Sequence, residues 1–194
     1  NMCSPSRVDA LWTRAVKVTD GVYHGIAEVK NPLPDAQAKG LEYSMSLYDV
    51  GNILIAERKG TIDLDPGQTR SVFEANIITG SRIPVRSFTK FAGGSWSKAA
   101  PWTSPIKVIP GTLDQTALSL PATLENTTAV AVTDITADAL LYDANDILIA
   151  ASETHVARMQ PRERKDIIFT CAVPFSAPVV RTDIEVRIPH DVVH

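Results

Sequence analysis

Apolar and polar residues alternate with a period of two along much of this chain. The alternation is clearest near the C-terminus, from Val180 to Ile188, where every second residue is Arg, Asp or Glu. A second example runs from Tyr43 to Leu47, where two serines separate larger side chains. Because successive side chains of a strand point to opposite faces of its sheet, this pattern predicts strands with one buried and one solvated face. No window shows a capped apolar stripe of helical period, so we expect at most short helical turns.

Turn-forming residues separate the apolar runs at strand-sized intervals. The segments 49–52 and 143–146 are rich in Asp, Asn and Gly, which tolerate the positive φ of hairpin loops. The segments 65–68 and 160–163 each carry a Pro and form an equivalent later loop. Many short strands at this spacing favour an antiparallel β-sandwich. We expect about seven strands in each half of the chain, near 12–18, 22–30, 41–48, 53–59, 61–65, 69–78 and 84–91, and near 102–108, 115–125, 134–142, 147–152, 154–159, 165–173 and 179–188.

Two segments of the sequence occur twice. Residues 12–21 return as 102–111, and residues 47–56 return as 141–150. The repeat is too long for a solenoid unit, whose period is roughly 20–50 residues, so each copy is a domain. We therefore expect four segments: a flexible lead (1–10), a first β-sandwich domain (11–91), a linker rich in Gly, Ser and Ala (92–101) and a second β-sandwich domain (102–190).

Composition narrows the classes of partner. The chain of 194 residues is 44% hydrophobic and 21% charged, which is enough apolar content for a core in each half. Its net charge of −3 gives no basic excess for a phosphate backbone, so we expect no nucleic-acid partner. Its two cysteines, Cys3 and Cys171, do not form the regular framework of a disulfide-stabilised module.

The segment 43–49, Tyr-Ser-Met-Ser-Leu-Tyr-Asp, resembles the FxLYD domain family, with the turn 31–32 before it and 66–67 after it. Met45 stands where the family usually has Phe, and Ala139 takes that place in the second copy. The resemblance implies small immunoglobulin-like β-sandwiches, mostly in exported bacterial proteins, that serve as structural or binding modules without known catalytic residues. We therefore expect an all-β chain of two tandem immunoglobulin-like antiparallel β-sandwich domains.

The Leu-Tyr-Asp motif has a structural interpretation. Leu47 should point into the core in step with Tyr43 and Met45, and Tyr48 should lie on the opposite face against a neighbouring strand. Asp49 should accept backbone N–H bonds within the hairpin turn. A catalytic Tyr-Asp pair is the alternative, but the motif stands beside a turn in both copies, which favours the structural role.

Three residues outside this motif are considered as sites. Cys3 opens a Cys-Ser-Pro-Ser segment that is similar to the start of a mature bacterial lipoprotein, so it is a candidate lipid anchor; the alternative is an exposed thiol. Trp96 lies in the expected linker and is either a wedge between the domains or an aromatic contact for a partner. Cys171 shares a predicted core face with Phe169 and should be an inert, packed thiol.

No metal site or catalytic motif is expected. His24 and His155 lie on different predicted strands, while His190 and His194 lie in a C-terminal tail that is unsuited to a metal-binding helix. The segment 143–154 starts like a calcium loop but lacks the required Gly and Glu. The common hydrolase, phosphate-loop and zinc motifs are missing from the sequence, so we expect no cofactor, no metal and no enzymatic activity.

Three hypotheses about function remain open. The first is a non-enzymatic, extracytoplasmic structural or protein-interaction module, with membrane attachment only through Cys3. The second is a carbohydrate- or small-ligand-binding protein with a site between the domains. The third is a hydrolase whose residues assemble only in space.

Overall fold

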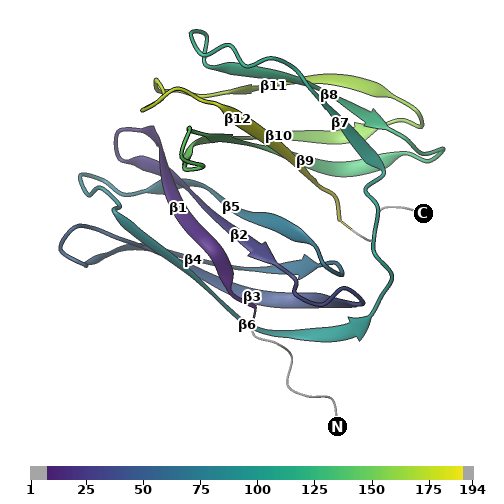
Figure 1. The fold of residues 1–194 in the computed structure, drawn as a ribbon, viewed down its shortest axis with the longest axis horizontal. Coiled ribbons are helices and arrows are strands. Elements are labelled where there is room, and N and C mark those ends of the chain that lie inside the picture. Colours follow the sequence, from purple (N-terminus) through teal and green to yellow (C-terminus); the bar gives the residue numbers. More distant parts are fainter. Residues whose placement is uncertain (1–7, 190–194) are drawn as a thin grey trace. The chain divides into compact units, whose positions relative to one another are not determined.

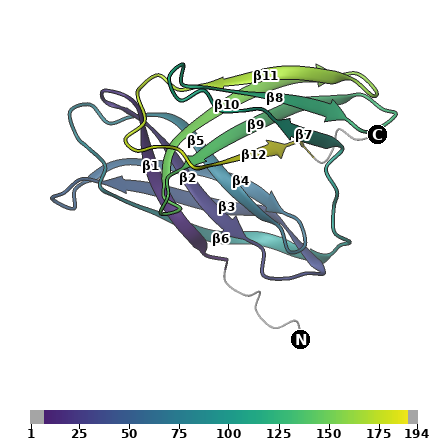
Figure 2. The same cartoon turned by 45° about the horizontal axis from the view of Figure 1, so that its top comes forward.

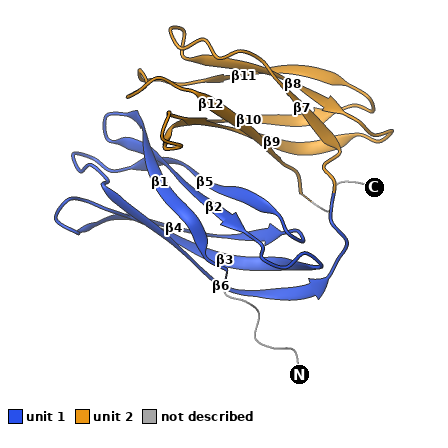
Figure 3. Cartoon of the chain, in the orientation of Figure 1, with its two compact units in different colours: residues 1–102 blue, residues 103–194 orange. Residues whose placement is uncertain are grey.

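The chain folds into strands joined by turns. The structure is a computed structural model that describes residues 8–189, and every regular element in that range is a β-strand. It divides into two compact units, residues 1–102 and residues 103–194 (Figure 3). Unit 1 contains β1 (Ala10–Thr19), β2 (Val22–Lys30), β3 (Ala36–Tyr48), β4 (Leu54–Leu64), β5 (Thr69–Ile78) and β6 (Arg86–Lys98). Unit 2 contains β7 (Ile106–Pro110), β8 (Ser119–Asn126), β9 (Val132–Tyr142), β10 (Leu148–Met159), β11 (Arg164–Thr170) and β12 (Arg181–Arg187).

Each unit is a sandwich of two three-stranded antiparallel sheets. Unit 1 has the strand orders β1-β2-β5 and β4-β3-β6, and unit 2 has β7-β8-β11 and β10-β9-β12. The two layers of each unit are visible in Figures 1 and 2. The two orders match strand for strand, as expected for two copies of one module. The predicted all-β class with two β-sandwich domains is therefore confirmed.

The prediction of seven strands in each half is wrong, because the described residues of each unit form six. The long strand β4 replaces two predicted strands, and Gly60, taken as a break between them, pairs with Tyr43 in mid-strand. A Cβ atom at position 60 would lie 2.5 Å from the Tyr43 hydroxyl, so the glycine makes room for the ring. In unit 2, β10 likewise runs without interruption through the predicted break at Glu153, which pairs with Asp138.

The predicted linker 92–101 is wrong over most of its length. Strand β6 continues to Lys98, and its residues 92–98 pair with residues 36–42 of β3. The glycines that suggested a linker instead allow positive φ inside this strand pair, at Gly93 (65°) and Gly94 (77°). A Cβ atom at position 94 would lie only 3.2 Å from the Leu41 backbone.

Each unit buries its own apolar cluster between its two sheets. The members are the inward-facing residues of paired strands, as the period-two pattern predicts. Burial of this apolar surface is the main favourable term in folding. The unit 1 cluster contains Val8, Ala27, Val29, Ala38, Leu41, Met45, Ile62, Leu64 and Val72. The unit 2 cluster contains Leu120, Ala122, Ala137, Ala139, Leu141, Ala150, Phe169 and Val179.

A buried asparagine joins three segments at the same place in each unit. Asn31 follows β2, and its amide donates to the carbonyls of Ala36 (2.7 Å) and Asp65 (2.8 Å) while its Oδ1 accepts the N–H of Leu33 (2.9 Å). Asn126 is the last residue of β8 and makes the same three bonds, to Val130 O (2.7 Å), Gln160 O (2.9 Å) and Thr128 N (3.0 Å). The segments 65–68 and 160–163 are thereby tied to equivalent positions, as the repeat predicts.

Candidate functional site

The outward side chains of the sheet β4-β3-β6 form a polar surface on unit 1. We call it the serine face, because the register places Ser44 beside Lys59 and Lys90, and Ser46 beside Glu57 and Phe88. The smallest side chains therefore lie on the central strand, with longer ones on both flanking strands. The serine face comprises Glu42, Ser44, Ser46 and Tyr48 on β3, Glu57, Lys59 and Thr61 on β4, and Phe88, Lys90 and Ala92 on β6.

Two adjoining hollows lie on the serine face. The larger has a volume of about 520 Å³, and its lining includes Glu42, Thr61 and Ser44. The smaller has a volume of about 390 Å³, and its lining includes Ser46 in addition to Ser44. Both are also lined by Lys90. Since two residues are common to both linings, the hollows follow one another along β3.

Hydrogen bonds fix several side chains of the serine face. The Ser44 hydroxyl donates to Glu57 Oε1 (2.6 Å), and Lys59 Nζ lies 3.3 Å from Glu57 Oε2. These two partners, the Ser44 hydroxyl first, hold the pKa of Glu57 below its ordinary value. Farther along β3, the rings of Tyr48 and Phe88 meet edge to face with centroids 6.0 Å apart. Several side chains of the serine face are thus held by contacts with one another.

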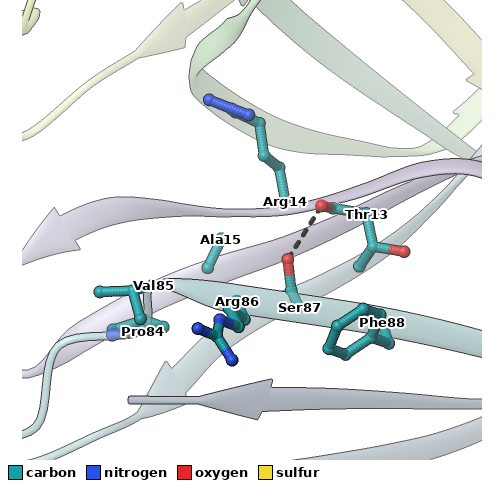
Figure 4. Close-up of a pocket in the computed structure, with 8 residues that line it drawn as sticks. All are labelled: Thr13, Arg14, Ala15, Pro84, Val85, Arg86, Ser87 and Phe88. Carbon is teal, nitrogen blue, oxygen red and sulfur yellow. Dashed lines mark hydrogen bonds between the residues drawn. The ribbon is translucent and has the colours of Figure 1, made fainter. Parts of the chain in front are cut away.

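A third hollow of about 390 Å³ lies where β1 runs beside β6 (Figure 4). The Ser87 hydroxyl donates to the Thr13 carbonyl (2.9 Å), and the Thr13 hydroxyl donates to that of Thr89 (2.9 Å), so the two edge strands are joined. Arg14 and Arg86 both line the hollow but point in opposite directions (Figure 4). They therefore do not converge on one anion.

Apolar side chains gather on two loops and on the first residue of β4 at one end of unit 1. We call them the loop-tip patch; each residue is at least half exposed, and the members are Val50, Ile53, Leu54, Ile83 and Val85. The two loops are tied together by the Val85 N–H, which donates to the Tyr48 carbonyl (2.9 Å), and by an ion pair between Arg82 and Asp49 (2.6 Å). The patch is thus held on an ordered support.

The equivalent sheet of unit 2, β10-β9-β12, carries a buried ion pair on the matching face. Asp138 takes the register position of Ser44 and is fully buried. Its carboxylate accepts two bonds from the Arg187 guanidinium (2.8 and 2.9 Å), which also contacts Glu153 (2.6 Å). Burial raises the pKa of Asp138 to about 7, although the Arg187 charge opposes that rise.

The structure confirms the predicted roles in the Leu-Tyr-Asp motif. Leu47 and Met45 are buried, and Tyr43 packs against the unit 1 core. Tyr48 lies on the opposite face with its ring against Phe88 of the neighbouring strand. Asp49 Oδ1 accepts the Ile53 N–H (2.9 Å) within the hairpin turn. Asp143 does the same in unit 2 for the N–H groups of Asn145 (2.8 Å) and Ile147 (3.0 Å).

The other candidate residues are scattered. Trp96 lies on β6, pairs with Ala38 and packs against the unit 1 core; its role as a wedge or partner contact stays a prediction. Cys171 is a free thiol that packs against the unit 2 core, as expected, and burial raises its pKa. The proposed anchor Cys3, and His190 and His194, lie outside the described residues.

The histidines of the described segment do not meet. His24 lies in unit 1, where its Nδ1 accepts the Asn76 N–H (3.1 Å) and its ring centroid is 4.9 Å from that of Phe73. His155 lies on β10 in unit 2. Between residues 8 and 189, no group of three or more His, Cys, Asp or Glu is placed to hold a metal ion. The same range contains no helix long and apolar enough to cross a bilayer.

The serine face and the buried ion pair were both missed from the sequence. The alternation of Ser44 and Ser46 with larger residues predicts a strand, but not that the small side chains leave a hollow. A signal was available in the repeat, which aligns Ser44 with Asp138 and Ser46 with Leu140. Arg187 was assigned only to the solvated face of the last strand, because its carboxylate partner lies on another strand.

Comparisons with known proteins give only remote structural likeness. No family model and no curated protein matches the sequence. A crystal structure of red sea bream transglutaminase matches with 13% identity and a TM-score of 0.29, covering 95% of this chain and 31% of that one. The yeast delta-COP-I mu-homology domain, in complex with a Dsl1 WxWxV peptide, matches with 11% identity and a TM-score of 0.23, covering 89% and 76%. This chain therefore spans less than a third of the transglutaminase. At these TM-scores neither likeness carries an inference about function.

Proposed function

We propose that this protein is a non-enzymatic interaction module that binds a protein partner through the loop-tip patch of unit 1. The observation that carries the proposal is the gathering of five large apolar residues, each at least half exposed, on two adjoining loops and the first residue of β4. Exposed apolar groups of this kind mark interaction sites on folded proteins, and binding residues concentrate on loops held by a rigid scaffold.

The equivalent loops of unit 2 support this assignment by contrast. The backbone bond that ties the loops of unit 1 recurs in unit 2, where the Val180 N–H donates to the Tyr142 carbonyl (2.9 Å). In the matching positions, Ala144 replaces Val50 and Pro178 replaces Ile83, whereas Ile147, Leu148 and Val180 keep the residue types of Ile53, Leu54 and Val85. The scaffold therefore does not require large apolar residues at positions 50 and 83, which favours a role in binding for Val50 and Ile83.

The family and the cellular location belong to the same proposal. The segment 43–49 and its flanking turns support an FxLYD-like, immunoglobulin-like module, and that resemblance favours a place outside the cytoplasm. Cys3 is the residue through which a lipid would attach the chain to a membrane. A mass spectrum of the mature protein isolated from its source would show the added mass of a lipid on the peptide that contains Cys3.

The interaction itself is tested by cross-linking the full chain in an extract of its own source. The variant V50S/I83S removes the apolar tips, and the matched control I78S/I168S removes two other exposed isoleucines. We expect the wild type and the control to capture the same protein, and V50S/I83S to capture at least tenfold less, since burial of apolar surface is the main favourable term in most protein association. Equal capture by all three proteins would contradict the proposal.

A further inference from the structure

We propose that the serine face of unit 1 is a second binding site, and that its ligand is a neutral oligosaccharide. This site goes beyond the proposed protein interaction and depends on different side chains. The shape of the two hollows, the chemistry of their walls and the matching face of unit 2 support it.

The shape suits an extended ligand. The two hollows, of about 520 and 390 Å³, are each within the size range of small-molecule sites, roughly 300–1,000 Å³. They adjoin along β3 between Glu42 and Tyr48, a distance of about 20 Å at the usual rise of a strand. A chain of several sugar rings would fill both hollows, whereas a compact ligand would fill one.

The polar groups suit a ligand rich in hydroxyls. The Ser46 and Thr61 hydroxyls can each donate and accept, the Ser44 hydroxyl, which donates to Glu57, can accept, the two lysines donate, and the two glutamates accept. The two ammonium groups balance the two carboxylates, so the surface has no net charge with which to select an ion. A sugar hydroxyl also both donates and accepts, and it can therefore satisfy any of these groups.

An aromatic ring completes the site. Phe88 lines the smaller hollow and is 54% exposed, and its contact with Tyr48 holds the ring. A pyranose presents C–H groups on one face of its ring, and the exposed phenyl group offers an apolar surface against which that face can pack. Walls that combine polar groups with apolar surface, including one aromatic ring held by Tyr48, thus match both sides of a sugar.

The duplication shows that the fold does not dictate this surface. In unit 2 the matching positions hold Asp138 and Leu140 in place of the two serines, and Asp183 in place of Phe88. In unit 1, Glu57 accepts the Ser44 hydroxyl and lies 3.3 Å from Lys59 Nζ, so two contacts hold this carboxylate in the wall of the site.

A peptide fits the same surface less well. Strand β3 is paired with β4 on one side and β6 on the other, so its backbone N–H and C=O groups are used within the sheet. A peptide lying on the face could not add main-chain hydrogen bonds as it does at a free sheet edge. An oligosaccharide needs only the side chains that the face presents.

In the test, the full chain is titrated with cellohexaose, xylohexaose, mannohexaose and maltohexaose, and binding is monitored through the amide chemical shifts of the protein. We expect at least one of these sugars to shift the amides of Ser44, Ser46 and Phe88 in a saturable way. S46L fills the smaller hollow with the side chain found in unit 2, and F88D removes the ring; each should weaken binding at least tenfold. The matched control S95L adds a leucine elsewhere on β6 and should bind as the wild type does.

Several outcomes would overturn the site. The site is wrong if none of the four sugars shifts these amides, or if the shifts map to other residues. It is also wrong if S46L and F88D bind the sugar as tightly as the wild type does, or if the face binds a peptide but no sugar. Thermal unfolding of each variant checks that lost binding is not lost folding. V50S/I83S should retain sugar binding, so failure here and failure of the proposed protein interaction are distinguishable.

Discussion

The outward faces of two equivalent sheets, β4-β3-β6 in unit 1 and β10-β9-β12 in unit 2, differ although their strand orders match. At one register position the first carries Ser44, beside two hollows, and the second carries Asp138, buried and paired with Arg187. The turns, by contrast, keep the same side-chain bonds at Asn31 and Asn126. The duplicated module thus preserves the contacts that fix the backbone, while its outward-facing positions have diverged.

The largest expected effect concerns the ion pair. Well above pH 7, where Asp138 is ionised in the folded protein, R187M leaves its carboxylate buried without a partner, and breaking such a pair costs about 3–5 kcal/mol of folding free energy. Urea unfolding, followed through the amide resonances of unit 2, measures the loss. D138L/R187M removes both charges and should recover most of the stability, because an apolar pair of similar volume can replace a buried ion pair.

The matched change in unit 1 is K59M, which breaks the exposed contact with Glu57. It should leave the unfolding free energy close to that of the wild type, since the ion pairs of exposed side chains contribute little. If K59M lowers the unfolding free energy as much as R187M does, the exposed contact of unit 1 and the buried ion pair of unit 2 contribute equally to stability, contrary to their difference in burial.

This contrast also separates what the sequence could predict from what it could not. The class of fold and the hairpin role of Asp49 follow from local patterns, because alternation and turn chemistry involve residues close together in the chain. The uninterrupted strand at Gly60 does not, since the reason for that glycine is the Tyr43 ring on another strand. The pairing of Asp138 with Arg187 likewise depends on strand register, which a single sequence leaves open.

The same reason applies to the candidate sites. Ser44 and Ser46 leave hollows only because Lys59, Lys90 and Phe88 stand beside them on the neighbouring strands. Trp96 was placed in a linker from the composition around it, whereas its pairing with Ala38 puts it in a strand against the core. Composition shows that a segment is rich in Gly and Ser, but not that the segment pairs with another strand in a sheet.

A second prediction concerns the pH dependence of unit 2. The pKa of Asp138 is about 7 in the folded state, above its ordinary value of 3.8, because of burial, so folding favours its protonated form. The stability from this group is complete below pH 3.8 and is lost as the pH rises through about 7. Glu153 shares the Arg187 guanidinium and therefore adds a second carboxylate that opposes ionisation of Asp138.

Urea unfolding of unit 2 at a series of pH values from about 4 to about 8 measures this dependence. We expect the wild type to lose stability over that range relative to D138N, which cannot ionise at this position. If the wild type and D138N depend on pH in the same way, the Arg187 charge offsets the effect of burial on Asp138. If the wild type gains stability with rising pH relative to D138N, the Arg187 charge outweighs burial.

The smallest effect is expected on the serine face. S44A removes the hydroxyl that donates to Glu57, so the pKa of Glu57 should rise toward its ordinary value of 4.5. The carboxyl resonance of Glu57, followed through a pH titration, reports the change. Asp20 is the internal control, because its lowered pKa depends on Lys17 and should not move. The unfolding free energy should stay within about 0.5 kcal/mol, since the contact is exposed. If the titration of Glu57 is unchanged in S44A, the Ser44 hydroxyl does not hold this carboxylate. The Ser44–Glu57 contact would then no longer distinguish the serine face from the matching face of unit 2.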